Sequence, residues 1–503
     1  MKLKIKLKIL VVFLCLFSFI NVRADEKIIP PILKKENEDI EKIIDSINNE
    51  VKENKEENKD KEDKKENEEI KKKKEIRDEK NIERKANIID NCDNLEVSGK
   101  QLNLLDLIKI GICNNPNLNK EFINIKVSES KLKQQKSEYL PTISASVSTQ
   151  ESDSKVQGGN RTEQNPYNAT LSLNWLLYDF GGRSARVKEM KNELDSNVFS
   201  YNAEMQDLIL SINTKYLNLL SAKESLKSAE ANEITFGISY KESSKRYEIG
   251  SASLNDKLQA KTSYEQSTLE VIDARNKVKK YMGDLAVLLN LPPETEFDLK
   301  DLPTDSDMFA LKENETIENL MQIALEKRFE LKEKQSILEA NLNNVKNARS
   351  NRLPTINLSA STGYSDSWKK ETDYTKSSSV KLSLTMPIFT GFSTVNQVSE
   401  AKYKYQQARL DLRNTENTIR NEVWTAYQDY LTSVESYNLS KQILESAEEN
   451  EKVAFKSYEV GKIDIINLLT ATSQLADARQ GKITAFYNVL VSKANLYKAI
   501  GRF

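Results

Sequence analysis

The sequence predicts an α+β membrane protein in which one unit of long helices and short strands occurs twice. The stretches "SEYLPTISASVSTQ" (137–150) and "SNRLPTINLSASTG" (350–363) share one order of charged run, Leu-Pro-Thr-Ile and alternating residues. Each is followed by a second alternating run, and then by the proline-free segments 183–290 and 392–503. Self-similarity over so long a distance indicates duplication of one large unit rather than a solenoid.

The first 24 residues have the pattern of a secretory signal peptide. Four lysines precede an apolar run that ends at the small residue Ala24. A retained membrane anchor is the alternative, but the run is shorter than the roughly 20 residues that a spanning helix needs. Residues 25–95 are mostly Lys, Glu, Asp and Asn, too polar to offset the entropy of ordering. We expect a disordered arm there, or a single loose helix, with a spacer or wall-binding role as the functional alternative.

Two cysteines remain after the signal peptide, Cys92 and Cys113. In an exported protein they can pair, because disulfides persist outside the cytoplasm. The bond would close a loop of about 20 residues and stabilise the fold by about 3 kcal/mol in the chain-entropy model. Alternatively, Cys113 is a small buried residue on a helix face. Mass spectrometry of the non-reduced protein separates the two, since two free thiols would exclude the bond.

Composition argues against an enzyme or a nucleic-acid-binding protein. Lys and Arg number 75 against 76 Asp and Glu, so no strong positive field is available for nucleic acid. The chain has no histidine, which removes the usual general base and metal ligand. It also lacks Walker, GxSxG and CxxC motifs. We therefore expect no catalytic, metal or cofactor site.

Each unit contains two predicted strands with one apolar face and one polar face. Pro141 and Pro354 mark the helix-to-strand junctions, because proline ends a helix and favours extended geometry before it. The strands are expected at about 141–150, 167–178, 354–364 and 379–388. This length and alternation are typical of strands that cross an outer membrane, although a soluble sandwich is the alternative. Four strands cannot close a barrel and open edges are not tolerated in lipid, so other copies must complete it.

Long helices follow both strand pairs. Gly181, Gly182 and Gly391 permit a sharp strand-to-helix turn. Residues 392–458 then predict a helix of roughly 100 Å at 1.5 Å per residue. Its predicted packing seam consists of Val398, Ala401, Tyr405, Ala408, Leu412, Thr415 and Ile419. The apolar pattern breaks at Gly250 and Gly461, as at a helix C-terminus, and then resumes. Each unit is therefore a hairpin, and a linker (291–315) joins the first unit (96–290) to the second (316–503).

With helix, Leu-Pro, strand, loop, strand, glycine turn, long helix, tip and return helix occurring twice, residues 96–503 resemble the TolC family of outer-membrane efflux proteins. The resemblance implies a homotrimer with a 12-stranded β-barrel in outer-membrane lipid and a long α-helical barrel in the periplasm. It implies a periplasmic adaptor (membrane fusion) protein and an inner-membrane transporter as partners. The implied function is the passive exit duct of a tripartite efflux pump or type I secretion system, with the cargo left open. A non-conducting coiled-coil envelope or surface protein is the alternative.

The resemblance also assigns roles to residues at the hairpin tips. The family motif is similar to YxxGxxxxxDVLxA, and this chain has "YEIGSASLNDKLQA" and "YEVGKIDIINLLTA". The tip residues implied to contact the adaptor are Tyr247, Gly250, Tyr458 and Gly461. Acidic residues are implied at the inner mouth, where Asp256 is the stronger gate candidate because Asn467 and Thr470 stand at the second unit's acidic positions. The alternative is that these glycines only end helices.

Overall fold

The computed structural model describes residues 101–155, 157–158, 161–164, 166–296, 298–300, 316–367 and 374–502. They belong to one compact unit, Cys92–Phe503, which is described by itself. The predicted signal peptide (1–24), the charged arm (25–95) and the linker residues 301–315 lie outside the described residues. Cys113 is disulfide-bonded, but Cys92 also lies outside the described residues, so their pairing stays a prediction.

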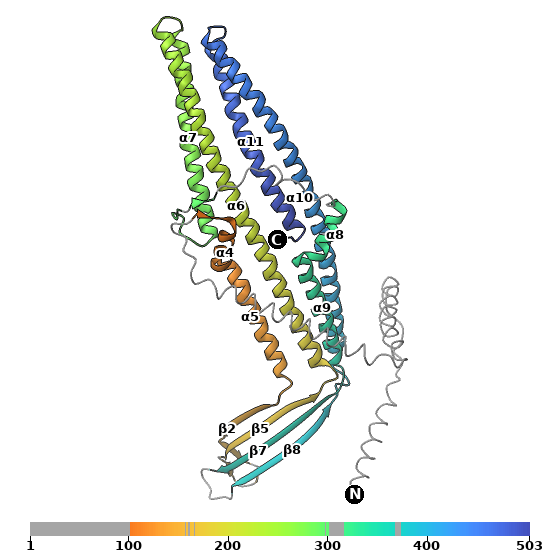
Figure 1. Cartoon of the computed structure of the whole chain (residues 1–503). Helices are drawn as coiled ribbons and strands as arrows, with labels where there is room; N and C mark the ends of the chain where they lie inside the picture. The colour runs from red at the N-terminus through yellow and green to blue at the C-terminus, as the bar shows by residue number, and fades with distance from the viewer. Residues whose placement is uncertain are drawn as a thin grey trace. The chain divides into compact units, whose positions relative to one another are not determined.

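Two successive halves of this unit have the same order of elements (Figure 1). The first half contains α4 (Leu104–Asn114), α5 (Pro116–Ser137), β2 (Thr142–Thr149), β5 (Pro166–Tyr178), α6 (Gly182–Glu248) and α7 (Leu254–Leu288). The second contains α8 (Ile317–Lys327), α9 (Phe329–Ser350), β7 (Thr355–Ser367), β8 (Thr375–Thr385), α10 (Ser393–Glu459) and α11 (Ile465–Ala499). Corresponding helices have equal lengths of 11, 22, 67 and 35 residues.

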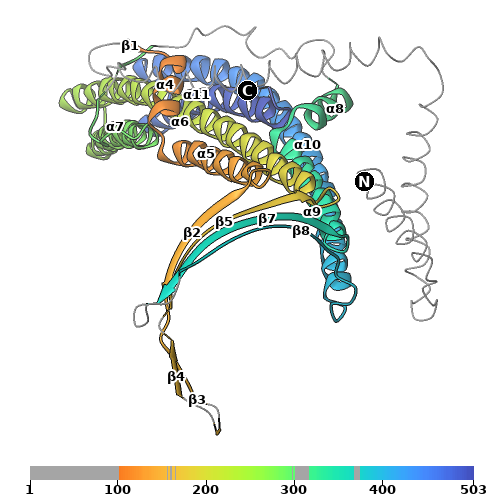
Figure 2. The same ribbon diagram turned by 90° about the horizontal axis from the view of Figure 1, so that it is seen from below.

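The strands form one antiparallel sheet in the order β2-β5-β7-β8. Figure 2 shows it as a curved layer with β2 at one edge and β8 at the other. Within the described part of the chain, neither edge pairs with a further strand. A small two-stranded sheet of β3 (Ser152–Lys155) and β4 (Arg161–Gln164) extends from the loop between β2 and β5. Among the described residues, the outer edges of β2 and β8 thus have no strand partner for their backbone hydrogen-bonding groups.

The long helices pair as two hairpins, α6 with α7 and α10 with α11, and the sheet lies at the end opposite the hairpin turns (Figure 1). Helix α5 packs on α6, and α9 packs on both α6 and α10. The predicted seam of α10 is confirmed: Val398, Ala401, Ala408 and Ile419 are buried, the first two against Val345 and Ala348 of α9. The small side chains of this seam let the helices approach closely.

The predicted helix ends at the hairpin tips are also confirmed. Helix α6 stops at Glu248 and α10 at Glu459, and Gly250 and Gly461 follow with φ of 77° and 76°. This left-handed region is open to glycine at no steric cost.

Sequence reasoning missed a parallel pair, β1 (Gln101–Leu102) with β6 (Asp298–Leu299), which ties the linker to the start of the unit. A two-residue strand has no periodic pattern to recognise.

A buried ion cluster connects helices of the second half to one another. Arg328, between α8 and α9, is 2% exposed. Its guanidinium donates to Glu330 at 2.7 and 2.8 Å, to Glu422 at 2.8 Å and to the Ala499 carbonyl at 3.2 Å. Burial alone would raise the pKa of Glu330, but the hydrogen bonds and charge of Arg328 outweigh it and hold that pKa below its usual value. The cluster fastens α9, α10 and the end of α11 to one another.

We predict that Arg328→Ala lowers the free energy of unfolding by about 3 kcal/mol, because a buried ion pair that loses one partner leaves an uncompensated charge. Thermal melting followed by far-ultraviolet circular dichroism measures the loss, and Arg409→Ala at an exposed site of α10 is the control. Since the pKa of Glu330 is depressed, its contribution is complete above the ordinary value of 4.5 and is lost as the pH falls through the folded value. Equal acid sensitivity of wild type and Arg328→Ala would contradict the assignment.

Candidate functional site: the two-faced sheet and the paired helical tips

The strand register sorts the sheet residues into two faces. Directly opposed residues in antiparallel strands lie on the same face. One row across all four strands is apolar, Ile143, Leu173, Ala360 and Val380, and the adjacent row consists of Ser144, Ser172, Ser361 and Ser379. The predicted alternation therefore produces one apolar and one hydroxyl-bearing face, and on the latter Ser361 and Ser379 hydrogen-bond across the strands at 2.9 Å.

The apolar face is open in the single chain. Val147 is 82% exposed, Val380 78% and Leu382 67%. A contiguous apolar surface of this kind marks contact with lipid or with a partner.

Aromatic residues border this face at both ends. Far from the helices, the hydroxyls of Tyr167 and Tyr364 both donate to Asp366, at 2.9 and 3.0 Å. Near the helices, the indole of Trp175 donates to the Tyr139 carbonyl at 2.9 Å. Eight positions separate Tyr167 from Trp175 along β5, or about 26 Å at 3.3 Å per residue. Outer-membrane barrels have an apolar band of about 25 Å between two aromatic girdles.

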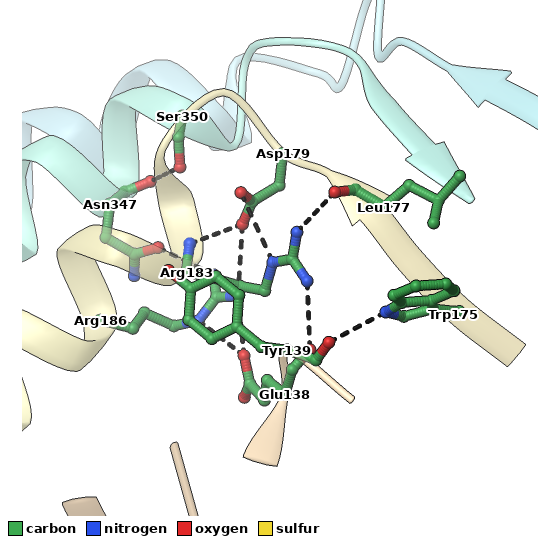
Figure 3. A network of polar contacts seen from close by, with 9 residues as sticks. All are labelled: Glu138, Tyr139, Trp175, Leu177, Asp179, Arg183, Arg186, Asn347 and Ser350. Atoms are coloured by element: carbon green, nitrogen blue, oxygen red, sulfur yellow. Dashed lines mark hydrogen bonds and ion pairs between the residues drawn. The ribbon is translucent and has the colours of Figure 1, made fainter. Parts of the chain in front are cut away.

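Figure 3 shows a polar network where the sheet meets the helices. Arg183, in the first turn of α6, is 5% exposed. Its guanidinium donates to the carbonyls of Glu138 at 3.2 Å and Leu177 at 2.9 Å and lies 4.6 Å from the ring centroid of Tyr139. Its backbone N–H donates to the Asp179 carboxylate. A β-bulge between Leu176 and Tyr178 interrupts the ladder next to the Leu177 carbonyl that Arg183 uses.

A second arginine extends this network to the other half of the chain. Arg186 donates to Glu138 at 2.8 Å and to the Asn347 side chain of α9 at 3.1 Å. A Cβ at Gly182 would lie 2.6 Å from the Ser350 hydroxyl oxygen and 2.8 Å from Asp179 Oδ2. The predicted turn glycines therefore have different roles. Gly181 and Gly391 have the positive φ of 92° and 60°, whereas Gly182 closes the turn with its N–H, which donates to the Asp179 carbonyl at 3.2 Å, and has no room for a side chain.

The predicted site residues did not include Asp179, Arg183 or Arg186. Their signal was the i,i+4 spacing of Asp179 and Arg183 across the glycine turn "YDFGGRSAR". The predicted residues did include Pro141 and Pro354, which directly precede β2 and β7.

The two hairpin tips lie together. Tyr458 is 3% exposed and belongs to a cluster with Ala260 of α7 and Ile465 and Leu468 of α11. The Arg246 guanidinium lies 4.7 Å from the Tyr458 ring centroid and donates to the Glu459 carbonyl at 3.3 Å. Arg246, which sequence reasoning missed, thus links the first tip to the second.

The predicted adaptor residues of the first tip differ from those of the second. Tyr247 is 38% exposed, with the Lys257 ammonium 5.2 Å from its ring centroid. The same sequence pattern therefore gives one buried and one accessible tyrosine.

The gate candidates lie at the starts of the two return helices. Asp256 forms a capping box with Ser253 through two hydrogen bonds of 3.1 Å. In the second half the cap is Asp464, which accepts the Asn467 backbone N–H at 3.0 Å. Sequence reasoning did not select Asp464, although Asp three residues before Asn and an apolar run is an N-cap signal.

An open groove of about 470 Å³ lies between the starts of α7 and α11. Thr470 lines it with Asn255, Leu258, Ile466 and other residues, and its hydroxyl donates to the Ile466 carbonyl at 2.8 Å. The structure thus brings Thr470 to a groove between the return helices, whereas Asp256 belongs to the capping box of α7.

Among the described helices, none combines the length and the apolar character that a membrane-spanning helix requires. In the same part of the chain, no three His, Cys, Asp or Glu side chains come together as a metal site.

Comparison with known proteins gives one consistent family. The family model described as "Outer membrane efflux protein" matches residues 107–291 and 320–502. Outer membrane protein TolC of Escherichia coli (strain K12) is 25% identical over 413 residues, which are 79% of this chain and 82% of that protein. Protein CyaE of Bordetella pertussis is 25% identical over 382 residues, 75% of this chain and 80% of that protein. The solved structure of the outer-membrane channel OprN has a TM-score of 0.71 at 18% identity, covering 80% of this chain and 90% of that one.

We predict that Asp placed at Leu171 or Leu382 lowers the yield of assembled oligomer. A carboxylate on the apolar face near the middle of the band costs on the order of 1–2 kcal/mol in lipid. Ser172→Asp and Ser383→Asp, on the polar face of the same strands, are the matched controls and should assemble normally. Heat-modifiable mobility on gels of membrane extracts measures the yield, and equal yields from both sets would overturn the assignment of faces.

Proposed function

The chain belongs to the outer membrane efflux protein family, and from this premise we propose that three copies of it form one passive exit duct. It is a channel protein of the outer membrane with its helices in the periplasm. The observation that carries the proposal is a two-faced, four-stranded sheet with open edges, joined directly to helices of 67 residues.

Barrel closure requires several copies, and three is the number that the resemblance to the TolC family implies. A sheet edge in lipid leaves backbone groups unsatisfied, and only a closed barrel removes the edges. Three copies of four strands give 12 strands, which is wide enough to leave a lumen. The apolar face then meets lipid, and the face with Ser144, Ser172 and Ser361 meets water.

The helices supply the tunnel. A helix of 67 residues is about 100 Å long at 1.5 Å per residue, a length suited to crossing the periplasm. We take the two halves to be repeats of one unit, so that a trimer presents six similar hairpins.

The hairpin tips supply the docking site for a periplasmic adaptor, which connects the duct to an inner-membrane transporter. Ile249 and Val460, next to Gly250 and Gly461, are 76% and 67% exposed. Such apolar projections suit a helical hairpin of the adaptor, with Tyr247 at the accessible edge. The energy for transport comes from the transporter, and the cargo, drug or polypeptide, is selected there.

The inner mouth supplies the gate. Three copies of Asp256 bring like charges together, which repel one another and attract cations. Contacts such as Arg246 with Tyr458 hold neighbouring tips in place. Asn467 and Thr470 are uncharged members of the same region, and Asp464 adds a second carboxylate from each copy.

Planar-bilayer recording tests the duct. Purified trimer should conduct with a preference for cations. Absence of conductance from folded trimer would favour the alternative, a non-conducting coiled-coil envelope or surface protein.

We predict that Asp256→Asn lowers cation selectivity and block by multivalent cations. Asparagine keeps the oxygen that accepts the Ser253 N–H, so the charge is removed and the cap is retained. Asp464→Asn removes the other carboxylate of each copy and should lower cation selectivity as well. Asn467→Ala removes no charge, so it is the control and should change selectivity little. If cation selectivity is unchanged by Asp256→Asn but is abolished by changes at Asn467 or Thr470, the gate belongs to the second half.

A further inference from the structure

We infer that neighbouring copies meet through the same contact that joins the two halves of one chain, so that Glu400 of one copy lies against Lys131 of the next. The inference rests on the proposed trimer and specifies the surfaces and the register that close it.

The two halves correspond at fixed offsets. Helices α6 and α10 start and end 211 positions apart, as do α7 and α11. Helices α5 and α9 start and end 213 positions apart, as do α4 and α8. The strand hairpins also match, since Thr142 opposes Asn174 in the first half and the corresponding Thr355 opposes Thr385 in the second.

The joint between the halves is made by β5 on β7 and by α6 on α9. In the helical part, the Asn344 amide donates to Glu189 at 2.7 Å. One turn closer to the sheet, Arg186 donates to Asn347 at 3.1 Å. Farther from the sheet, the ring of Phe199 stacks on that of Phe329 with centroids 6.4 Å apart.

Applied to the residues of this joint, the offsets predict the corresponding contact between α10 of one copy and α5 of the next. Moving 211 positions forward takes Glu189 to Glu400, and moving 213 positions back takes Asn344 to Lys131. The amide of the internal joint thus becomes an ammonium opposite a carboxylate, a pair of complementary charge. In the single chain Glu400 is 62% exposed and pairs with Lys404 of its own helix at 2.7 Å, an exposed ion pair that is easily exchanged.

The exposure of apolar side chains on α5 and α10 supports the same contact between copies. Ala340 of α9 is 6% exposed because α6 and α10 cover its helix. Its counterpart on α5 is Val127, which is 47% exposed, and Ile123 one turn earlier is 60% exposed. Leu410, the counterpart of Phe199 on α10, is 65% exposed. The surfaces of α5 and α10 therefore expose large apolar side chains at the positions that correspond to the buried joint between α9 and α6.

The same offsets join the open sheet edges without changing faces. Leu173 opposes Ala360 inside the chain, and the counterparts are Leu384 of β8 and Val147 of β2. Both counterparts belong to the apolar face, so this register keeps lipid-facing residues together across the joint, whereas a slip of one residue would invert them. A head-to-tail contact that repeats an internal rotation generates a ring.

Cysteine crosslinking tests the register. Leu384→Cys with Val147→Cys in one chain should give a covalent trimer on non-reducing denaturing gels, because opposed Cβ atoms lie within about 5.5 Å. Glu400→Cys with Lys131→Cys should give the same product with a short bismaleimide. Two control pairs move one cysteine to the opposite face of its strand or helix: Leu384→Cys with Ser146→Cys, and Glu400→Cys with Lys133→Cys. Both control pairs should give little product.

Charge reversal gives an independent readout. Lys131→Glu or Glu400→Lys should lower the temperature at which the trimer dissociates, and the double exchange should restore it. For the crosslinking experiment, Glu189→Cys with Asn344→Cys is the positive control, because this pair should crosslink within one chain at the corresponding positions of the internal joint. Intact conducting trimers without either intercopy crosslink would overturn the inferred register and leave the duct standing, whereas absence of trimer in the wild type would remove the proposed function itself.

Discussion

The backbone hydrogen bonds of β2 and β8 constrain the rest of this molecule. A four-stranded sheet whose apolar face meets lipid has two edges, and each edge carries N–H and C=O groups that hydrocarbon cannot satisfy. In the proposed trimer, pairing those edges with other copies satisfies them and defines a lumen behind the serine-rich face. The same pairing sets the arrangement in which the attached helices enter the periplasm.

The junction between sheet and helices differs between the halves. In the first half, Arg183, Arg186, Asp179 and Glu138 connect α5, α6 and the strand end, and Arg186 reaches α9 (Figure 3). The counterparts in the second half are Thr394, Gln397, Thr390 and Asn351, and Thr390 and Thr394 hydrogen-bond at 3.0 Å. The first half therefore has a charged network at its junction, with one hydrogen bond from Arg186 to α9, where the second half has uncharged side chains. In the proposed trimer, the joint between copies relies on strand pairing and exposed side chains.

The tips show a similar divergence within a common plan. Both tips have tyrosine and a left-handed glycine, yet Tyr458 is covered by Arg246 whereas Tyr247 stands at an accessible edge. An aspartate stabilises the start of each return helix: Asp256 at the third position of a capping box with Ser253, and Asp464 as the N-cap itself. In the proposed duct, each carboxylate also contributes charge to the inner mouth.

The sequence by itself determined the local order of this protein. Pro141 and Pro354 ended helices, Gly250 and Gly461 turned the hairpins, and the alternation around Leu171 and Leu382 set the two faces of the strands. These features depend on single residues or short periods, so they are visible along the chain.

The tertiary structure decided which of those residues meet. It brought Arg246 onto Tyr458 across 212 positions of sequence and buried Arg183 against carbonyls of α5 and β5. It placed Gly182 beside Ser350, and it made Asp256 a capping residue. Such contacts depend on how two helices and a strand pack in space, and no local pattern encodes the partner of a buried side chain.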